Sequence, residues 1–223
     1  MEIKKLSKSI FSSRYYITKK LRKEVEYIIQ HFISKNNSIL DYGCGNSPYR
    51  EMFNDKNSKY VTADIVENIL AEVHLDSKGQ VPLDNNSFDT IISTQVLEHV
   101  DNPNLYLSEV KRLLKKDGTL ILSTHGYWLY HPTPNDYWRW TSAGLKKILS
   151  ENGFDIIYFN GIMNRSSVGL QLFQDGLLFK LPSFIIPIFC FFMQIGVIFF
   201  DKLSSKLARD ADACVYVIVA RLK

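Results

Sequence analysis

Two hydrophobic periods alternate along the chain and predict its elements. Apolar residues at helical spacing between 18 and 33 predict an amphipathic helix. Short apolar or alternating runs at 38–42, 59–64, 71–76, 87–93, 119–123, 154–159 and 213–220 predict strands. Helical stripes separate several of these runs, notably at 103–114 and 142–150. Strands that alternate with helices predict an α/β protein built on a largely parallel sheet.

A glycine turn follows the first predicted strand. Asp41 ends that strand, Gly43 and Gly45 follow, and Ser47 and Pro48 are typical of the N-cap and first position of a helix. This order predicts a ligand-binding corner at the carboxyl end of the strand. A dinucleotide would favour a third glycine where Pro48 stands, so the pattern argues against a nicotinamide oxidoreductase.

Acids end the next two predicted strands. Asp64 lies 19 residues beyond Gly45, where a carboxylate can accept both hydroxyls of a ribose. Asp76 closes the third strand, where the amino group of an adenine could be met. Asp41, two residues ahead of Gly43, suits the cationic end of a ligand. The three acids together predict an adenosine-type ligand with a positive charge.

The charge is concentrated at the N-terminus. The net charge is +4, whereas residues 1–23 hold eight Lys or Arg against Glu2 alone, a balance of +7 that leaves −3 for the remainder. This distribution does not favour general nucleic-acid binding. Three widely spaced cysteines without a C-x-x-C pair indicate neither zinc nor disulfides. The first residues lack the apolar run of a signal peptide, which predicts a cytoplasmic chain.

Four motifs in order resemble those of class I S-adenosylmethionine (SAM) dependent methyltransferases of the small-molecule, type 11-like branch. They are L-D-Y-G-C-G at 40–45, P-L-D-x-x-S-F-D at 82–89, V-L-E-H-V at 96–100 and K-x-G at 116–118. The resemblance covers about residues 37–160. It implies a Rossmann-like, seven-stranded, mostly parallel sheet with an antiparallel last strand and helices on both faces. It also implies SAM as cofactor, held by Asp41, Tyr42, Gly43, Cys44, Gly45, Asp64, Ile65, Asp76, Thr94 and Gln95.

An aromatic segment follows the fifth predicted strand. Residues 125–140 contain all three tryptophans of the chain, and H-P-x-P-x-D-x-W-R-W-T at 131–141 is similar to a subgroup found with bacterial surface-polysaccharide enzymes. Aromatic faces with interspersed polar groups suit a sugar. We predict His125, His131 or Asp136 as the base and Tyr130, Trp138, Arg139 and His99 as acceptor contacts. The spacing of His125, His131 and Asp136 is that of a loop, which predicts no metal site. The structural alternative to an acceptor site is that the segment is a packing lid.

An apolar stretch precedes the last strand. Residues 184–200 carry no charge, yet include Pro187, Gln194 and Gly196. A single membrane span would separate residues 213–220 from the sheet that they complete. For residues 177–203 the sequence therefore predicts an apolar helical hairpin or an interfacial helix that dips into the cytoplasmic leaflet without crossing it, with the basic N-terminus against anionic headgroups. The alternative is an apolar cap over the sheet or a partner copy in a homodimer.

These features predict one domain over residues 1–223. Its parts are a basic segment and helix at 1–36, a SAM-binding core at 37–160, an apolar helical insertion at 161–209 and the final strand at 210–223. The predicted activity is O-methylation of a sugar or glycan precursor in bacterial surface-polysaccharide biosynthesis. The predicted location is cytoplasmic and peripheral at the inner face of the plasma membrane. A lipid or quinone-like acceptor, or a non-catalytic SAM-binding membrane protein, remains an alternative.

Overall fold

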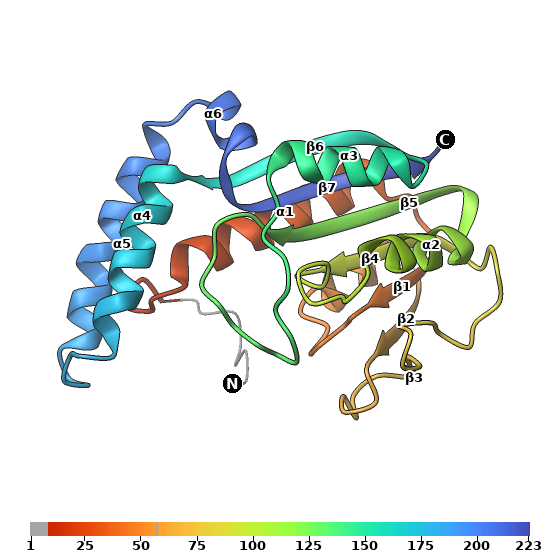
Figure 1. The fold of residues 1–223 in the computed structure, drawn as a ribbon, viewed down its shortest axis with the longest axis horizontal. Helices are drawn as coiled ribbons and strands as arrows, with labels where there is room; N and C mark the ends of the chain where they lie inside the picture. The colour runs from red at the N-terminus through yellow and green to blue at the C-terminus, as the bar shows by residue number, and fades with distance from the viewer. Residues whose placement is uncertain (1–8, 57) are drawn as a thin grey trace.

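Seven strands form one mixed sheet in a computed structural model that describes residues 9–56 and 58–223 (Figure 1). The sheet order is β3-β2-β1-β4-β5-β7-β6, and only β7 runs antiparallel to its neighbours. The strands are β1 (Ser38–Tyr42), β2 (Lys59–Asp64), β3 (Val73–His74), β4 (Phe88–Thr94), β5 (Leu114–His125), β6 (Phe154–Asn164) and β7 (Ala213–Leu222). The predicted fold class is confirmed.

Helices cover both faces of the sheet, as its two apolar cores require. On one face lie α2 (Pro103–Leu113) and α3 (Ser142–Glu151), whose stripes include Leu107, Val110 and Leu145. On the other face lie α1 (Tyr15–Phe32) and the 3-10 helix η1 (Arg50–Lys56), which bury residues such as Ile28 and Phe53. The parallel strands are buried between these layers.

The last strand, β7, lies between β5 and β6 and joins them in the sheet. β7 pairs with β5 and β6 along almost its whole length, and residues 213–220 are all buried. The chain must therefore return to the sheet after residue 164. Between β6 and β7 it forms α4 (Arg165–Leu178), α5 (Ile186–Lys202) and α6 (Lys206–Ala211). Figure 1 shows α4 and α5 side by side as an arm at one end of the sheet.

Three boundaries differ from the predicted ones. Ser47 does not cap a helix: it adopts a left-handed φ of 44°, and η1 begins only at Arg50. The third strand shortens to Val73–His74, which lies at the edge of the sheet and pairs only with Ala63 and Asp64 of β2. β6 runs on to Asn164, so the insertion begins later than residue 161, since Ile162 and Asn164 pair with β7.

No helix within the described residues is long and apolar enough to cross a membrane. The apolar stretch predicted at 177–203 forms the end of α4, a turn and the single helix α5, and α5 packs against α4. Lys4, Lys5 and Lys8 of the basic segment lie outside the described residues.

Candidate active site

The two glycines of the first turn have different tasks. Gly43 adopts a φ of +77°, and a Cβ built on it would lie 2.4 Å from Val96 Cγ2. Gly45 adopts a φ of +51°, but a Cβ there would meet no atom within 4 Å. Gly43 therefore serves the packing of the turn against the segment after β4. The backbone of Gly45 faces open space, where a ligand can lie directly upon it.

Carboxylates from β1 and β2 flank this turn. Asp64 ends β2, and its Oδ2 accepts hydrogen bonds from the Gly45 amide (2.8 Å) and from Asn68 Nδ2 (2.7 Å). Its other oxygen accepts from the amide of Ile65 at 2.8 Å. Asp41 is buried and accepts from Tyr60 Oη at 2.7 Å. Burial raises the pKa of Asp41 to about 6, against the hydrogen bonds that stabilise its charged form.

The remaining residues that the sequence predicts to hold the cofactor lie at the same edge of the sheet. Cys44 is buried, and its amide donates to Ala63 O at 3.1 Å, as the Gly43 amide does at 2.8 Å. Tyr42 stacks on Tyr106 with ring centroids 5.2 Å apart. Thr94 ends β4. Gln95 follows with a left-handed φ of 58° and donates from Nε2 to Ser123 Oγ at 2.9 Å. The carboxyl ends of β1, β2 and β4 thus lie side by side at one edge of the sheet.

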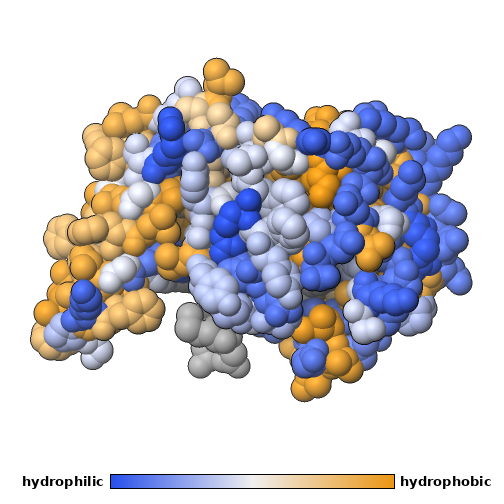
Figure 2. Space-filling model, viewed as in Figure 1, coloured by the Kyte–Doolittle hydropathy of each residue, from blue (hydrophilic) through white to orange (hydrophobic). Residues whose placement is uncertain are grey.

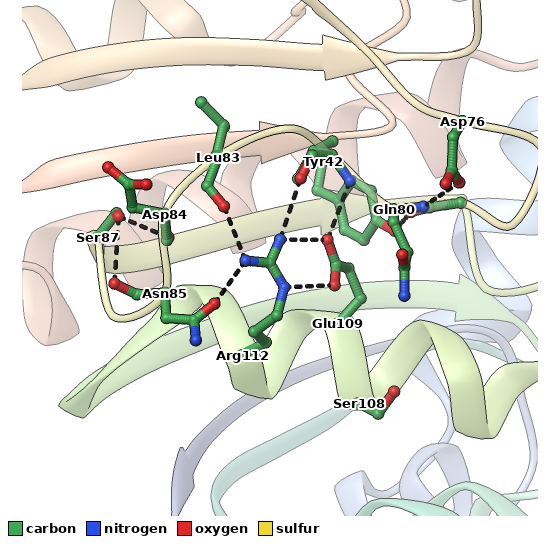
Figure 3. Close-up of polar contacts among 12 residues, drawn as sticks. Tyr42, Asp76, Gln80, Leu83, Asp84, Asn85, Ser87, Ser108, Glu109 and Arg112 are labelled. Atoms are coloured by element: carbon green, nitrogen blue, oxygen red, sulfur yellow. Dashed lines mark hydrogen bonds and ion pairs between the residues drawn. The ribbon is translucent and has the colours of Figure 1, made fainter.

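A hollow of about 310 Å³ extends this edge beyond β3 and is lined by His74, Leu75, Asp76, Gln80, Val81 and Pro82. Asp76 Oδ1 accepts from the amides of Lys78 and Gln80, both at 2.8 Å, which shapes the turn. Figure 3 shows how Arg112 fixes the following loop from α2: its guanidinium pairs with Glu109 and donates to Leu83 O at 2.7 Å. This clamp keeps the hollow preformed.

The aromatic segment closes over the carboxyl ends of β4 and β5. Its return is tied to β5 by the Trp140 amide, which donates to His125 O at 3.0 Å. The amides of Tyr137 and Trp138 both donate to Glu98 O, at 2.9 and 3.1 Å. Trp138 also donates from Nε1 to Val100 O at 2.8 Å. The loop is therefore anchored at both ends beside the cofactor residues.

An internal ion pair shapes this loop. Asp136 contacts Arg139 through both carboxylate oxygens, each at 2.6 Å, and accepts the His131 amide at 2.8 Å. Burial acts to raise the pKa of Asp136, but the Arg139 pair outweighs it and lowers the pKa to about 2. Arg139 also donates to Trp128 O, Leu129 O and Trp138 O. Both side chains are engaged in holding the loop, which makes them the weakest of the predicted acceptor-site residues.

Three histidines gather under the loop around a buried acid. His125 lies 2.9 Å from Glu98 through Nδ1 and Oε1, and Thr124 donates to the second oxygen of Glu98 at 2.8 Å. Among the described residues, neither His125 Nδ1 nor Glu98 Oε1 has a further partner. Burial acts to raise the pKa of Glu98, but the interactions with His125 and Thr124 outweigh it and the net shift is downward.

His131 lies at the centre of the cluster. Its ring packs edge-to-face with the rings of His125 and His99, with ring centroids 5.3 Å and 4.8 Å apart respectively. One ligating atom each of Glu98, His99 and His131 lies within 4.8 Å of the others. Burial, followed by the neighbouring histidines, lowers the pKa of His131. His125 is only 3% exposed because Trp128 stacks flat on it at 4.9 Å, so His131 is the more accessible of the two.

The structure brings most predicted residues together. His125, His131 and His99 meet in one cluster, and Trp138 and the highly exposed Tyr130 lie on the loop above it. His99 Nδ1 contacts Asn135 O, which ties it to the loop. Sequence reasoning missed Glu98 as a partner of His125. The sequence signalled Glu98 as the acid of the V-L-E-H-V motif, four residues after β4, but not as a partner of His125.

The chain belongs to a methyltransferase family. A sequence profile described as "Methyltransferase domain" matches residues 13–158, which is more than half of the chain. The strand order and the cofactor edge agree with this assignment. The chain thus carries a methyltransferase domain of class I, the SAM-dependent class, and SAM is the cofactor of that domain.

Curated relatives match this chain over only part of their own length. An uncharacterized protein of Methanocaldococcus jannaschii is 28% identical over 148 residues, which are 62% of this chain and 64% of that protein. The ubiquinone biosynthesis O-methyltransferase of Maricaulis maris is 32% identical over 100 residues, 39% of each chain. The chain therefore spans between about two fifths and two thirds of these relatives.

Among solved structures, that of the [4+2]-cyclase SpnF superposes with a TM-score of 0.62 at 16% identity. The superposition covers 95% of this chain and 84% of that one. At this identity the likeness shows the fold alone. Because that neighbour is named a cyclase, the sheet does not by itself define a reaction.

The described residues fit SAM on geometric grounds. The open backbone face of Gly45 leaves room for the ligand, Asp64 would hold the ribose, and the hollow beside Asp76 would take the adenine. The buried Asp41 carboxylate would face the amino group of the methionine part. When bound, SAM supplies a methyl group on a sulfonium, which a nucleophile can accept in one displacement.

We expect Asp64→Ala to weaken SAM binding by about 1.5–3 kcal/mol, the order expected for the loss of charge-assisted hydrogen bonds. Isothermal titration calorimetry with SAM and S-adenosylhomocysteine measures this. Asp155→Ala on β6 is the matched control, since that carboxylate is exposed and distant in sequence from the turn. Unchanged affinity in Asp64→Ala, or tight NAD binding by the parent chain, would contradict the assigned site.

Proposed function

We propose that this chain transfers the methyl group of SAM to a hydroxyl oxygen of a sugar or glycan precursor in bacterial surface-polysaccharide biosynthesis. The observation that carries the proposal is the cluster of His99, His125 and His131 around Glu98, at the ends of the two strands beside the cofactor turn. A hydroxyl acceptor must lose its proton as it attacks, and such a cluster provides a base there.

His131 is the best placed to take that proton. It is less buried than His125, and its lowered pKa keeps the ring neutral and able to accept at neutral pH. SAM would supply the methyl group to the acceptor oxygen, and the hydroxyl proton would move to the imidazole of His131. The Glu98 carboxylate, with His125 beside it, stabilises the resulting imidazolium.

The loop supports a sugar as the acceptor. Tyr130, Tyr137 and Trp138 expose their rings on it, and such faces can stack on the CH faces of a sugar while polar groups bind its hydroxyls. The protein then mainly aligns the acceptor oxygen with the methyl group, which is the larger part of the rate gain in such a displacement.

A lipid or quinone-like acceptor is the second candidate. A hollow of about 210 Å³ is lined by Trp128 and Trp140 of the loop and by Leu172 from α4 of the apolar arm, together with polar side chains that include Arg139 and Asp212. The Maricaulis maris relative, named as a ubiquinone biosynthesis enzyme, favours the same acceptor class. A non-catalytic SAM-binding role would leave the histidine cluster without a purpose.

The proposed location is the cytoplasm, at the inner face of the plasma membrane, with no nucleic acid as partner. A homodimer is the competing explanation for the apolar arm. Neither bears on the chemistry of the histidine cluster.

A methyl-transfer screen tests the acceptor. The purified full-length chain is incubated with SAM carrying a labelled methyl group and with nucleotide-linked sugars, lipid-linked sugars or a catechol of the quinone type. We expect label in a sugar pool, released from the product only by cleavage of a methyl ether. Label in the catechol alone would establish the second candidate, and label in no acceptor while SAM binds would favour the non-catalytic role.

A further inference from the structure

The arm formed by α4 and α5 has its polarity reversed. Its outward positions are large and apolar: Phe179 at the turn between the helices is 94% exposed, Phe184 78% and Phe192 66%. Along α5 the exposed stripe continues through Ile188, Ile195 and Phe199. Figure 2 shows this hydrophobic surface gathered over the arm, apart from the polar surface of the sheet domain. A protein surface exposed only to water rarely shows so continuous a patch.

The inner seam of the arm is polar instead. Gln171 and Gln174 on α4 and Gln194 on α5 are all buried. Gln194 Nε2 donates to Gln171 Oε1 at 3.1 Å and to Gln174 Oε1 at 3.0 Å. All three side chains also donate to the carbonyl oxygen of Ser13, at 2.9–3.1 Å. Each amide therefore finds its partners within the arm and in the segment just before α1.

The start of α1 is held in this seam. The Tyr16 amide donates to Gln194 Oε1 at 2.9 Å, and Arg14 pairs with the buried Asp175 at 2.5 Å. Tyr16 Oη donates to the buried Asp201 at 2.7 Å. Polar groups satisfied internally under an apolar exterior are what helices need in a lipid environment, where no water can satisfy them.

The charges of the arm are sorted in the same way. Between 165 and 207 both acids, Asp175 and Asp201, are buried, and the exposed charged side chains are basic. Arg165 pairs with Asp212 and Lys206 with Asp210, so Lys180 and Lys202 are the basic residues of this segment that have no acidic partner among the described residues. A surface that is apolar and positive complements anionic lipid headgroups over an acyl layer.

We propose that the α4–α5 arm is a lipid-docking element that inserts its apolar face into the surface of an anionic bilayer. The 17-residue α5, about 25 Å long, lies in the interface without crossing it. The inference gives a structural basis to the membrane contact proposed above but does not rest on the acceptor. The arm is also in contact with the candidate active site. Asp175 of α4 pairs with Arg14, and the Arg14 guanidinium lies 4.6 Å from the centre of the Trp128 ring, which in turn stacks on His125.

Vesicle flotation of the full-length chain tests the proposal. We expect the protein to rise with vesicles of phosphatidylcholine and phosphatidylglycerol, much less with phosphatidylcholine alone, and to be partly released by high salt. The double variant Phe184→Ser and Phe192→Ser should lower the bound fraction at least tenfold, because it removes two exposed rings from the inserted face. Lys180→Gln with Lys202→Gln should lower binding to the anionic vesicles several-fold.

Leu105→Ser is the matched control, since Leu105 is a similarly exposed (55%) apolar residue on α2, away from the arm. It should leave flotation unchanged. Protein that stays at the bottom with both lipid mixtures would overturn the proposal, as would an equal loss in the control. A dimer in analytical ultracentrifugation that dissociates in the Phe192→Ser variant would assign the face to a second copy instead. Because SAM binding is measured separately on each variant, a failure here leaves the methyl-transfer proposal standing.

Discussion

Replacing His131 by Ala is expected to reduce turnover by about 100-fold or more while SAM affinity stays unchanged, because a positioned base contributes about 10²–10⁴-fold. His131 touches both His99 and His125 and stands within reach of the Glu98 carboxylate. Glu98→Gln keeps the shape of that side chain but removes the charge that stabilises the imidazolium. It should therefore lower turnover in the same direction, with little change in the KM for the acceptor.

The matched control is His31→Ala, which removes an exposed histidine from α1. It should have wild-type turnover. Normal turnover in His131→Ala, His125→Ala and Asp136→Ala alike would show that the loop is a packing lid. A chelator provides a further check, because Glu98, His99 and His131 also have spacing that suits a divalent cation. Loss of turnover with EDTA and recovery with metal would replace the proton-acceptor role by a metal site.

The pH profile follows from the same residue. The base is active when neutral, so activity falls as the pH drops through the pKa of His131. Because burial lowers that pKa, activity should persist to a lower pH than an ordinary histidine, with a pKa of about 6.5, would allow. A rate profile of kcat against pH measures this, and an acid limb that survives His131→Ala would assign it to another group.

Gly43→Ala is expected to lower the free energy of unfolding by about 2–5 kcal/mol. A left-handed φ costs an L-residue about 1–2 kcal/mol, and the new Cβ, 2.4 Å from Val96 Cγ2, adds an overpacking cost of about 1–3 kcal/mol. That sum is a large share of the roughly 5–15 kcal/mol that stabilises a domain. Urea unfolding measures it. Adding Val96→Ala should recover the overpacking part and leave the strain.

Gly45→Ala is the matched comparison. It has a left-handed φ as well but no neighbour within 4 Å, so only the strain of about 1–2 kcal/mol applies to stability. Its effect should fall on the cofactor: the added methyl group occupies the space above the turn, and SAM affinity should drop more than tenfold. Equal SAM affinity in Gly45→Ala and the parent would mean that the ligand does not lie on this backbone.

Local patterns determined most of the fold from the sequence. The amphipathic stripe containing Val25, Ile28 and Ile29 predicted α1, because side chains at helical spacing share one face whatever they pack against. The acid at the end of β2 and the glycine pair after β1 predicted the cofactor edge, since parallel strands present their carboxyl ends together. Seven alternating runs and their motifs led to the confirmed sheet.

Element ends were less well determined. Ser47 and Pro48 carry a helix-start signal, yet the turn takes Ser47 into a left-handed conformation and delays η1 to Arg50. β6 extends to Asn164 because β7 offers it a long partner, which is a property of the pair and not of either strand. Such boundaries depend on contacts between residues far apart in the chain.

Only the tertiary structure decided which candidate groups are available for chemistry. Asp136 and Arg139 looked alike as site residues, but their mutual ion pair and the loop carbonyls engage them. Glu98 and His125 come from different strand ends and meet only in the folded sheet. In the sequence, the glutamines at 171, 174 and 194 are compatible with a helix whether they are buried or exposed. Their convergence on Ser13, and with it the reversed polarity of the arm, depends on how α1, α4 and α5 pack, because hydrogen-bond satisfaction is a property of three dimensions.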